Sequence, residues 1–221
     1  GKRHAQGYAF ARTASDIVVT VDSDTVLDAS AIAEGLRPFG DPKVTAVAAN
    51  VRALNHRRNL LTRLIDMRYA NAFLFERAAY STVGSVVCCC GSLSFFRTAV
   101  VRRHLDDFLH QSFLGIQVQY GDDRRLTQYA LQDGLVRLQD TAVAYTLVPE
   151  TLGHYRRQQL RWNRSFFRES LWAIQRFGPR RWPFWISVAE LAVWMVFMIS
   201  LLAAVYVRPV LTGQMIPWSF V

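Results

Sequence analysis

The chain has 221 residues, of which 51% are hydrophobic, and this suits one large domain or one domain with an appendage. Only 19% of the residues are charged, which excludes a disordered chain and a highly charged tail. The formal net charge of +9 comes almost entirely from arginine and predicts an anionic partner, without deciding between nucleic acid, nucleotide and lipid. The three cysteines, Cys88–Cys90, are consecutive, so they lack zinc-site spacing, cannot form a disulfide framework between distant segments, and fit a reducing compartment.

Over residues 1–154, short β-branched runs alternate with longer amphipathic stretches. Strands that alternate with helices indicate an α/β layer with a mostly parallel sheet. We expect strands over residues 16–24, 43–54 and 84–96, and helices over residues 29–39, 60–80 and 122–134.

Residues 155–181 form a second zone, rich in arginine and aromatic side chains. It holds eight arginines and one acid, Glu169. Several apolar side chains share one helical face while the arginines lie mostly elsewhere, which predicts an amphipathic helix lying in a membrane interface. These apolar residues are Phe167, Leu171, Ile174 and Phe177.

Residues 182–207 predict a transmembrane helix. From Phe184 to Val207 there are 24 residues with one charge, Glu190. At roughly 1.5 Å per residue, such a helix crosses a hydrocarbon core of about 30 Å. Because the arginine-rich zone precedes it, the positive-inside rule places the α/β part in the cytosol. We expect residues 208–221 to be a loop and the start of a further membrane segment, and the chain to be an internal part of a larger membrane protein.

Two carboxylates, Asp22 and Asp24, follow the first predicted strand. Residues two apart in a strand point to the same side, and ligand sites in such sheets lie at the carboxyl ends of strands. Two hard oxygen ligands beside a phosphate suit Mg²⁺ or Mn²⁺. An isolated pair of this kind is more often a pair of solvated turn acids, but the buried run before it favours a site.

Two further motifs hold charged residues that suit a nucleotide-sugar site. Lys2 and Arg3 stand beside a glycine, where they either hold phosphates or form a solvated basic end. Asp122 and Asp123 stand at the start of a predicted helix. They either cap it and interact with its dipole, or supply a general base for a sugar hydroxyl.

The sequence Q-Q-L-R-W at residues 158–162 combines an amide, a guanidinium and an indole. Gln158 and Arg161 share a helical face, so Arg161 is suited to clamp a diphosphate and Trp162 to stack on a sugar ring. An interfacial helix with a snorkelling arginine and an anchoring tryptophan explains the motif nearly as well. The small residues of 88–93 predict a tightly packed strand and turn that a substrate can approach closely. Glu190 is expected to pair with a neighbouring helix.

The order of these motifs resembles that of the processive family 2 glycosyltransferases, and within them the hyaluronan synthases. The rhizobial chitin-oligosaccharide synthases are similar too, through the triple cysteine and L-T-R-L-I-D-M at 61–67. The resemblance covers residues 1–207. It is carried by G-K-R-H-A-Q at 1–6, V-D-S-D-T at 21–25, G-D-D-R-R-L-T at 121–127 and Q-Q-L-R-W-N-R-S-F-F-R-E-S at 158–170.

The resemblance implies a GT-A (nucleotide-diphospho-sugar transferase) domain on membrane helices that form a channel for a growing polysaccharide. It implies an inverting, Mg²⁺- or Mn²⁺-dependent enzyme of the plasma membrane, multi-pass, that uses UDP-GlcNAc and UDP-GlcA. Asp123 would be the catalytic base. The donor would be bound by Lys2, Arg3, Asp22, Asp24, Gln158, Arg161 and Trp162, with Asp24 as the metal ligand, and the acceptor by Cys89, Cys90, Gly91 and Trp162.

The chain departs from the family pattern in two ways. Ser92 stands where the family usually has proline, and the first part of the family's domain, with its uridine-binding acids, is absent. We therefore expect the chain alone to be inactive.

Three alternatives differ in what they predict. A chitin- or cellulose-type synthase would use a single UDP-sugar. A membrane-anchored nucleic-acid binder would account for arginine among aromatics, but not for four aspartates that repel phosphodiesters, so no nucleic-acid partner is expected. A non-catalytic channel scaffold would not need Asp123. The sequence predicts neither the sugar pair nor the oligomeric state.

Overall fold

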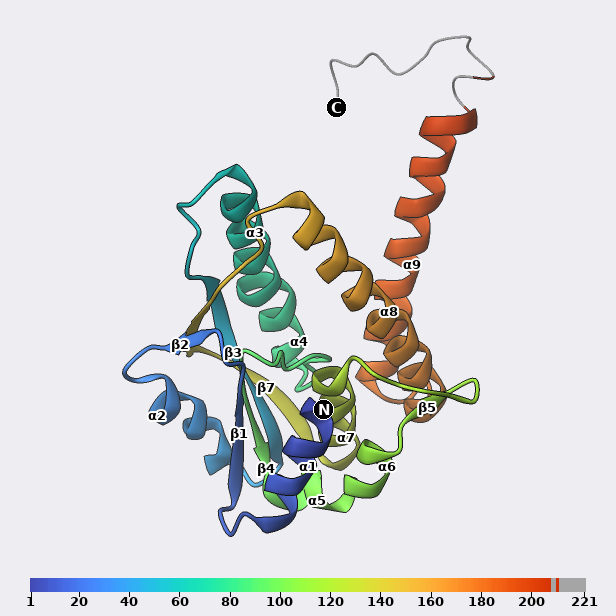
Figure 1. Ribbon diagram of the computed structural model, residues 1–221. Coiled ribbons are helices and arrows are strands. Elements are labelled where there is room, and N and C mark those ends of the chain that lie inside the picture. Colours follow the sequence, from blue (N-terminus) through green and yellow to red (C-terminus); the bar gives the residue numbers. More distant parts are fainter. Residues whose placement is uncertain (208–209, 211–221) are drawn as a thin grey trace.

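A computed structural model of the chain describes residues 1–207 and 210, and its centre is a five-stranded mixed sheet (Figure 1). Strands β3 and β7 run parallel, whereas the pairs β1–β4, β3–β4 and β2–β7 are antiparallel. The expected α/β layer is confirmed, but the expectation of a mostly parallel sheet is wrong, because β4 pairs between two strands that run against it. In spatial order the strands are β1 (Ile17–Val21), β4 (Leu93–Arg97), β3 (Val44–Ala53), β7 (Leu135–Thr146) and β2 (Thr25–Leu27).

Helices cover both faces of this sheet. Phe95 and Phe96, neighbours on β4, point to opposite faces as strand geometry requires. Phe95 packs with Ala31 of α2 on one face, and Phe96 packs with Leu126 and Tyr129 of α7 on the other. The first part of the chain contains α1 (Lys2–Arg12), α2 (Ala31–Leu36), η1 (Arg37–Gly40), α3 (Leu60–Asn71), η2 (Ala72–Arg77) and α4 (Ala78–Thr82). The remainder contains α5 (Thr98–Arg103), α6 (Leu105–Leu109), the hairpin β5 (Ser112–Phe113) and β6 (Ile116–Gln117), α7 (Asp122–Asp133), α8 (Leu152–Phe177), α9 (Trp182–Leu202) and η3 (Ala203–Val207).

The helix expected over residues 60–80 forms as α3, a π-helical stretch η2, and α4. Its start is fixed by a capping box: the Asn59 side chain accepts from the Thr62 amide, and the Thr62 hydroxyl accepts from the Asn59 amide. The strand expected over residues 84–96 forms only from Leu93, and residues 86–92 cross the domain as an irregular segment, largely buried. The short β-branched run there reflects burial rather than pairing.

Helix α8 runs from beside α3 back along the domain and packs against α9, whose far end extends away from the domain (Figure 1). The arginine-rich zone does form a helix, but part of its apolar side packs on protein, since Ser165, Glu169, Ala173 and Phe177 are buried. Among the described residues, one helix is long and apolar enough to cross a membrane, Trp182–Val207, with a mean hydropathy of 2.3. The further membrane segment expected within residues 208–221 lies outside the described residues apart from position 210.

Candidate functional site

Asp22 lies directly after β1, in contact with two segments that are distant in sequence. Its carboxylate forms an ion pair with Lys2 at the start of α1. On its other side it lies against Gly91, where a Cβ atom would stand 2.8 Å from Asp22 Oδ2. A side chain at this position would displace the Asp22 carboxylate, so the residue after the triple cysteine forms one wall of the Asp22 site.

Asp24 lies two residues further on, but in a turn rather than a strand. The Thr25 amide donates to the Asp22 carbonyl at 3.1 Å and closes this turn, so strand alternation does not place the two carboxylates. The Asp24 side chain is exposed, with one long contact from the Thr146 hydroxyl at 3.4 Å. Its oxygens are therefore free to accept a further ligand.

A divalent ion fits this pair of carboxylates. Mg²⁺ and Mn²⁺ are held in many nucleotide sites by one or two carboxylates together with phosphate oxygens and water. The described residues include no cluster of three or more His, Cys, Asp or Glu side chains that would form an all-protein metal cage. Asp24, whose carboxylate is largely unengaged, is the better placed ligand, since Asp22 already neutralises Lys2.

The first turn of α7 brings two acids to the same region. Gly121 begins the helix with a left-handed φ of 94°, and a Cβ there would stand 2.7 Å from Ser165 Cβ on α8. Asp122 accepts from Arg3 Nε and Nη2 at 2.8 and 2.6 Å in a largely buried ion pair. Arg3 is therefore held by the protein, and of the two basic residues only Lys2 extends into solvent.

Asp123 differs from Asp122 in its partners. Its Oδ1 accepts from the Arg124 amide at 2.8 Å. Burial raises the pKa of Asp123, against the lowering effects of that hydrogen bond and of the positive charges of Arg124 and Lys2, while the Asp122 charge raises it further. A half-buried carboxylate with a raised pKa beside a cationic group has the properties of a general base.

The triple cysteine is tied to α7 through Thr127, whose side chain is fully buried. The Cys89 amide donates to the Thr127 hydroxyl at 2.8 Å, and that hydroxyl donates to the Asp123 carbonyl at 2.7 Å. Arg77 Nε donates to the Cys88 carbonyl at 3.0 Å from the other side. Burial raises the pKa of Cys90 to about 12, so this thiol is neutral at physiological pH. The segment therefore acts through its backbone and shape.

Gln158, Arg161 and Trp162 lie on α8, one to two turns before its contact with α7. Trp162 is 38% exposed and Arg161 is exposed, whereas Gln158 Oε1 is buried. No hydrogen bond or ion pair joins these three side chains to another described residue. They are free to receive a ligand. Arg124, 5.2 Å from the Phe166 ring, links this part of α8 to Asp123.

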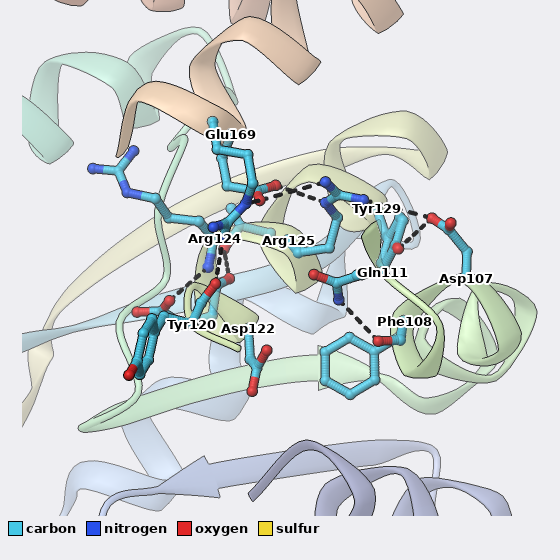
Figure 2. Close-up of polar contacts among 12 residues, drawn as sticks. Asp107, Phe108, Gln111, Tyr120, Asp122, Arg124, Arg125, Tyr129 and Glu169 are labelled. Carbon is cyan, nitrogen blue, oxygen red and sulfur yellow. Dashed lines mark hydrogen bonds and ion pairs between the residues drawn. The ribbon is translucent and has the colours of Figure 1, made fainter. Parts of the chain in front are cut away.

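Sequence reasoning missed the buried polar network that joins α7 to α8, shown in Figure 2. Glu169 is fully buried and accepts from Arg125 Nε at 2.6 Å and from Arg168 Nε at 2.7 Å. Arg168 also donates to the Tyr120 carbonyl, which precedes Gly121. A signal was present in the sequence, since Glu169 is the only acid among eight arginines.

Glu190 of α9 also faces protein. Its Oε2 is buried and has no hydrogen-bond partner among the described residues. Burial and the neighbouring Glu190 carboxylate both raise the pKa of Tyr80 on α4. The first half of α9 packs on the domain mainly through apolar side chains, with Ile186 in the core and Ser187 buried beside it.

Comparison with known proteins identifies the family and the fold of the chain. A sequence model described as "Glycosyltransferase like family 2" matches residues 1–165. A hyaluronan synthase of Streptococcus pyogenes is 44% identical over 197 residues, covering 89% of this chain and 45% of that protein. An N-acetylglucosaminyltransferase of Azorhizobium caulinodans is 43% identical over 176 residues, covering 79% of this chain and 44% of that protein. The chain thus spans less than half the length of these relatives.

A solved structure shows the same fold. The mannosyltransferase PcManGT from Pyrobaculum calidifontis, in complex with GDP-Man and Mn²⁺, matches with a TM-score of 0.57 and 18% identity. The match covers 96% of this chain and 63% of that one. At this identity the likeness concerns the GT-A fold alone.

Proposed function

The chain belongs to the family 2-like glycosyltransferases, and from this premise we propose that it is the core of a membrane-embedded, processive, inverting synthase that makes hyaluronan. The donors are UDP-GlcNAc and UDP-GlcA, and the acceptor is the end of the growing polysaccharide. The similarity to the streptococcal hyaluronan synthase supports this choice of substrates.

The arrangement of Lys2, Asp22, Gly91 and Asp123 is the observation that carries the proposal. Lys2 contacts Asp22, and its positive charge partly offsets the burial that raises the pKa of Asp123; this supports placing the cation and both carboxylates in one site. Asp123 takes the proton of the acceptor hydroxyl while the oxygen of that hydroxyl bonds to the anomeric carbon of the donor. The bond from that carbon to the diphosphate oxygen breaks, UDP leaves, and the configuration inverts.

The leaving diphosphate is bound by positive groups in this proposal. Lys2 and Arg161 contact it, and Asp24, with Asp22 beside it, would hold the Mg²⁺ or Mn²⁺ that neutralises its charge. Arg3, for which the sequence predicts contact with the donor, also forms an ion pair with Asp122 and would hold that carboxylate in place. The PcManGT complex with Mn²⁺ supports use of a divalent ion.

The acceptor lies between the cysteine segment and α8. Cys89, Cys90 and Gly91 border it through the backbone that Thr127 fixes, Trp162 stacks on its terminal sugar, and Gln158 supplies an amide. Helix α9 anchors the enzyme as one of several spans in the plasma membrane, with the α/β domain in the cytosol.

The second candidate is a chitin-oligosaccharide synthase that uses UDP-GlcNAc alone. The 43% identity to the Azorhizobium N-acetylglucosaminyltransferase supports this candidate nearly as strongly as the 44% identity to the streptococcal enzyme supports a hyaluronan synthase. The two differ only in the sugars that are joined.

The test uses membranes that contain the protein at its full natural length. They are incubated with Mg²⁺ and labelled UDP-GlcNAc, with and without UDP-GlcA, and polymer is measured. We expect polymer only with both donors. Polymer from UDP-GlcNAc alone would favour the chitin-type reading, and none from either would refute both. Asp123→Asn should abolish synthesis with membrane insertion unchanged, whereas a non-catalytic scaffold would tolerate it.

A further inference from the structure

The start of α3 and the start of α8 are joined into one protruding tip, which consists of residues 54–64 and 150–157. Asn59 Nδ2 donates to the Glu150 carbonyl at 2.9 Å, and Arg58 Nε lies 3.5 Å from Glu150 Oε2. Asn55 exchanges two hydrogen bonds with the Val148 backbone, at 3.0 and 2.9 Å. These bonds make the tip one rigid piece.

The tip exposes leucines although a small core lies directly below it. That core contains Ala53, Ile65 and Val148 with Tyr155 against it. Leu60, Leu64 and Leu152 point away from it and are 72%, 52% and 73% exposed. Leu60 and Leu64 are one helical turn apart and share a face, and Leu152 follows the segment bonded to Asn59. Apolar side chains gathered in this way mark a contact surface.

The tip is also strongly basic. It holds five arginines and one acid, Glu150, which is already engaged by Arg58. The arginines are Arg57, Arg58, Arg63, Arg156 and Arg157, all exposed. Leucines among arginines suit an anionic lipid surface, because the leucines enter the acyl boundary while the guanidinium groups bind phosphates.

The position of the tip favours lipid over another partner. Figure 1 shows the first turns of α3 and α8 on the side of the domain toward which α9 rises. The tip therefore lies on the same side of the domain as the far end of α9, the helix that is suited to cross a bilayer. Its charge has the sign that anionic headgroups require.

We propose that the tip docks on the anionic headgroups of this bilayer as a second membrane contact, separate from α9. The inference rests on the proposed membrane location and extends it. With α9 at one side and the tip at the other, the domain is held at two points, and its orientation to the bilayer is fixed.

The test measures lipid contact at single positions of the full chain. An environment-sensitive fluorophore is attached in separate proteins at Leu60→Cys, Phe197→Cys on α9 and Ala99→Cys on α5. The chain without an added cysteine gives the background from Cys88–Cys90. Each protein is reconstituted in phosphatidylcholine vesicles, with and without phosphatidylglycerol, that contain a spin-labelled lipid as quencher, shallow for the Leu60 and Ala99 labels and deep for the Phe197 label.

We expect the Leu60 label to be quenched strongly in the anionic vesicles, and the Ala99 label to stay at background. Arg57→Gln with Arg63→Gln should lower the quenching at Leu60 and leave that at Phe197 unchanged. Quenching at Phe197 without quenching at Leu60 would overturn the tip proposal but keep the membrane location. A Leu60 label shielded from both lipid and aqueous quenchers would overturn it in favour of a protein partner. Quenching at neither position would overturn both.

Discussion

Replacing Glu169 with glutamine should destabilise the α/β domain strongly. Glu169 is fully buried and pairs with Arg125 and Arg168, whose side chains are 5% and 11% exposed. Breaking a buried pair by removing one partner costs about 3–5 kcal/mol, because the remaining charge is uncompensated. Arg125 retains a second carboxylate, Asp107 Oδ2, at 3.8 Å, so we expect the lower end, about 3 kcal/mol. For a protein of this size that corresponds to a fall in Tm of about 6–12 °C.

Thermal unfolding in detergent micelles, followed by tryptophan fluorescence, measures this effect. Trp172 is a suitable reporter, since the Arg125 guanidinium lies 4.5 Å from its ring. Glu150→Gln is the matched control: it removes an exposed pair with Arg58, worth about 0–1 kcal/mol. Equal shifts in Tm for the two variants would refute the reasoning that Glu169 holds α8 on α7.

Three further predictions concern the site. Burial raises the pKa of Asp123 above 3.8, so its base form is lost as pH falls through that raised value. The acidic decline of kcat/KM with pH should therefore have its midpoint above 3.8, and a midpoint at or below 3.8 would contradict the role of Asp123 as the base. Gly91→Ala should raise the donor KM roughly tenfold, since its Cβ would stand 2.8 Å from Asp22 Oδ2 and displace that carboxylate; Ser92→Ala serves as the control, and equal KM values would exclude the proposed contact. Cys90, with its pKa raised to about 12, should react slowly with iodoacetamide at neutral pH and rapidly after unfolding, and fast labelling of the folded protein would show a thiolate instead.

The sequence pattern predicts the fold class and most of the elements, because burial and periodicity are local properties. It does not predict the direction of pairing. The β4 strand lies between β1 and β3, and nothing in residues 84–96 indicates which strands it pairs with. Nor does the sequence indicate that residues 86–92, predicted as the first part of this strand, are irregular. A buried irregular segment and a buried strand have the same composition.

The candidate site shows the same limit, because local sequence does not reveal which distant residues come into contact. Asp22, Asp24 and Asp123 stand out locally, but the ion pair of Arg3 with Asp122 joins residues 119 positions apart. Helical periodicity also cannot tell whether an apolar face meets lipid or protein. For this reason the sequence predicts that α8 lies in a membrane interface, whereas its second half packs on α7 and α9.

The short connection between α8 and α9 has a mechanical consequence. Only four residues, 178–181, separate the two helices, and both ends of this joint are fastened: Trp185 Nε1 donates to the Pro179 carbonyl at 2.8 Å, and Arg181 donates to the Leu131 carbonyl of α7. This short, hydrogen-bonded connection allows little movement of α9 relative to α8 and α7. In the proposed synthase, a force that a lengthening product exerts on α9 would be transmitted to α7 and its first turn. This arrangement favours small displacements of side chains and short segments over rotation of the whole domain as the way in which the product advances.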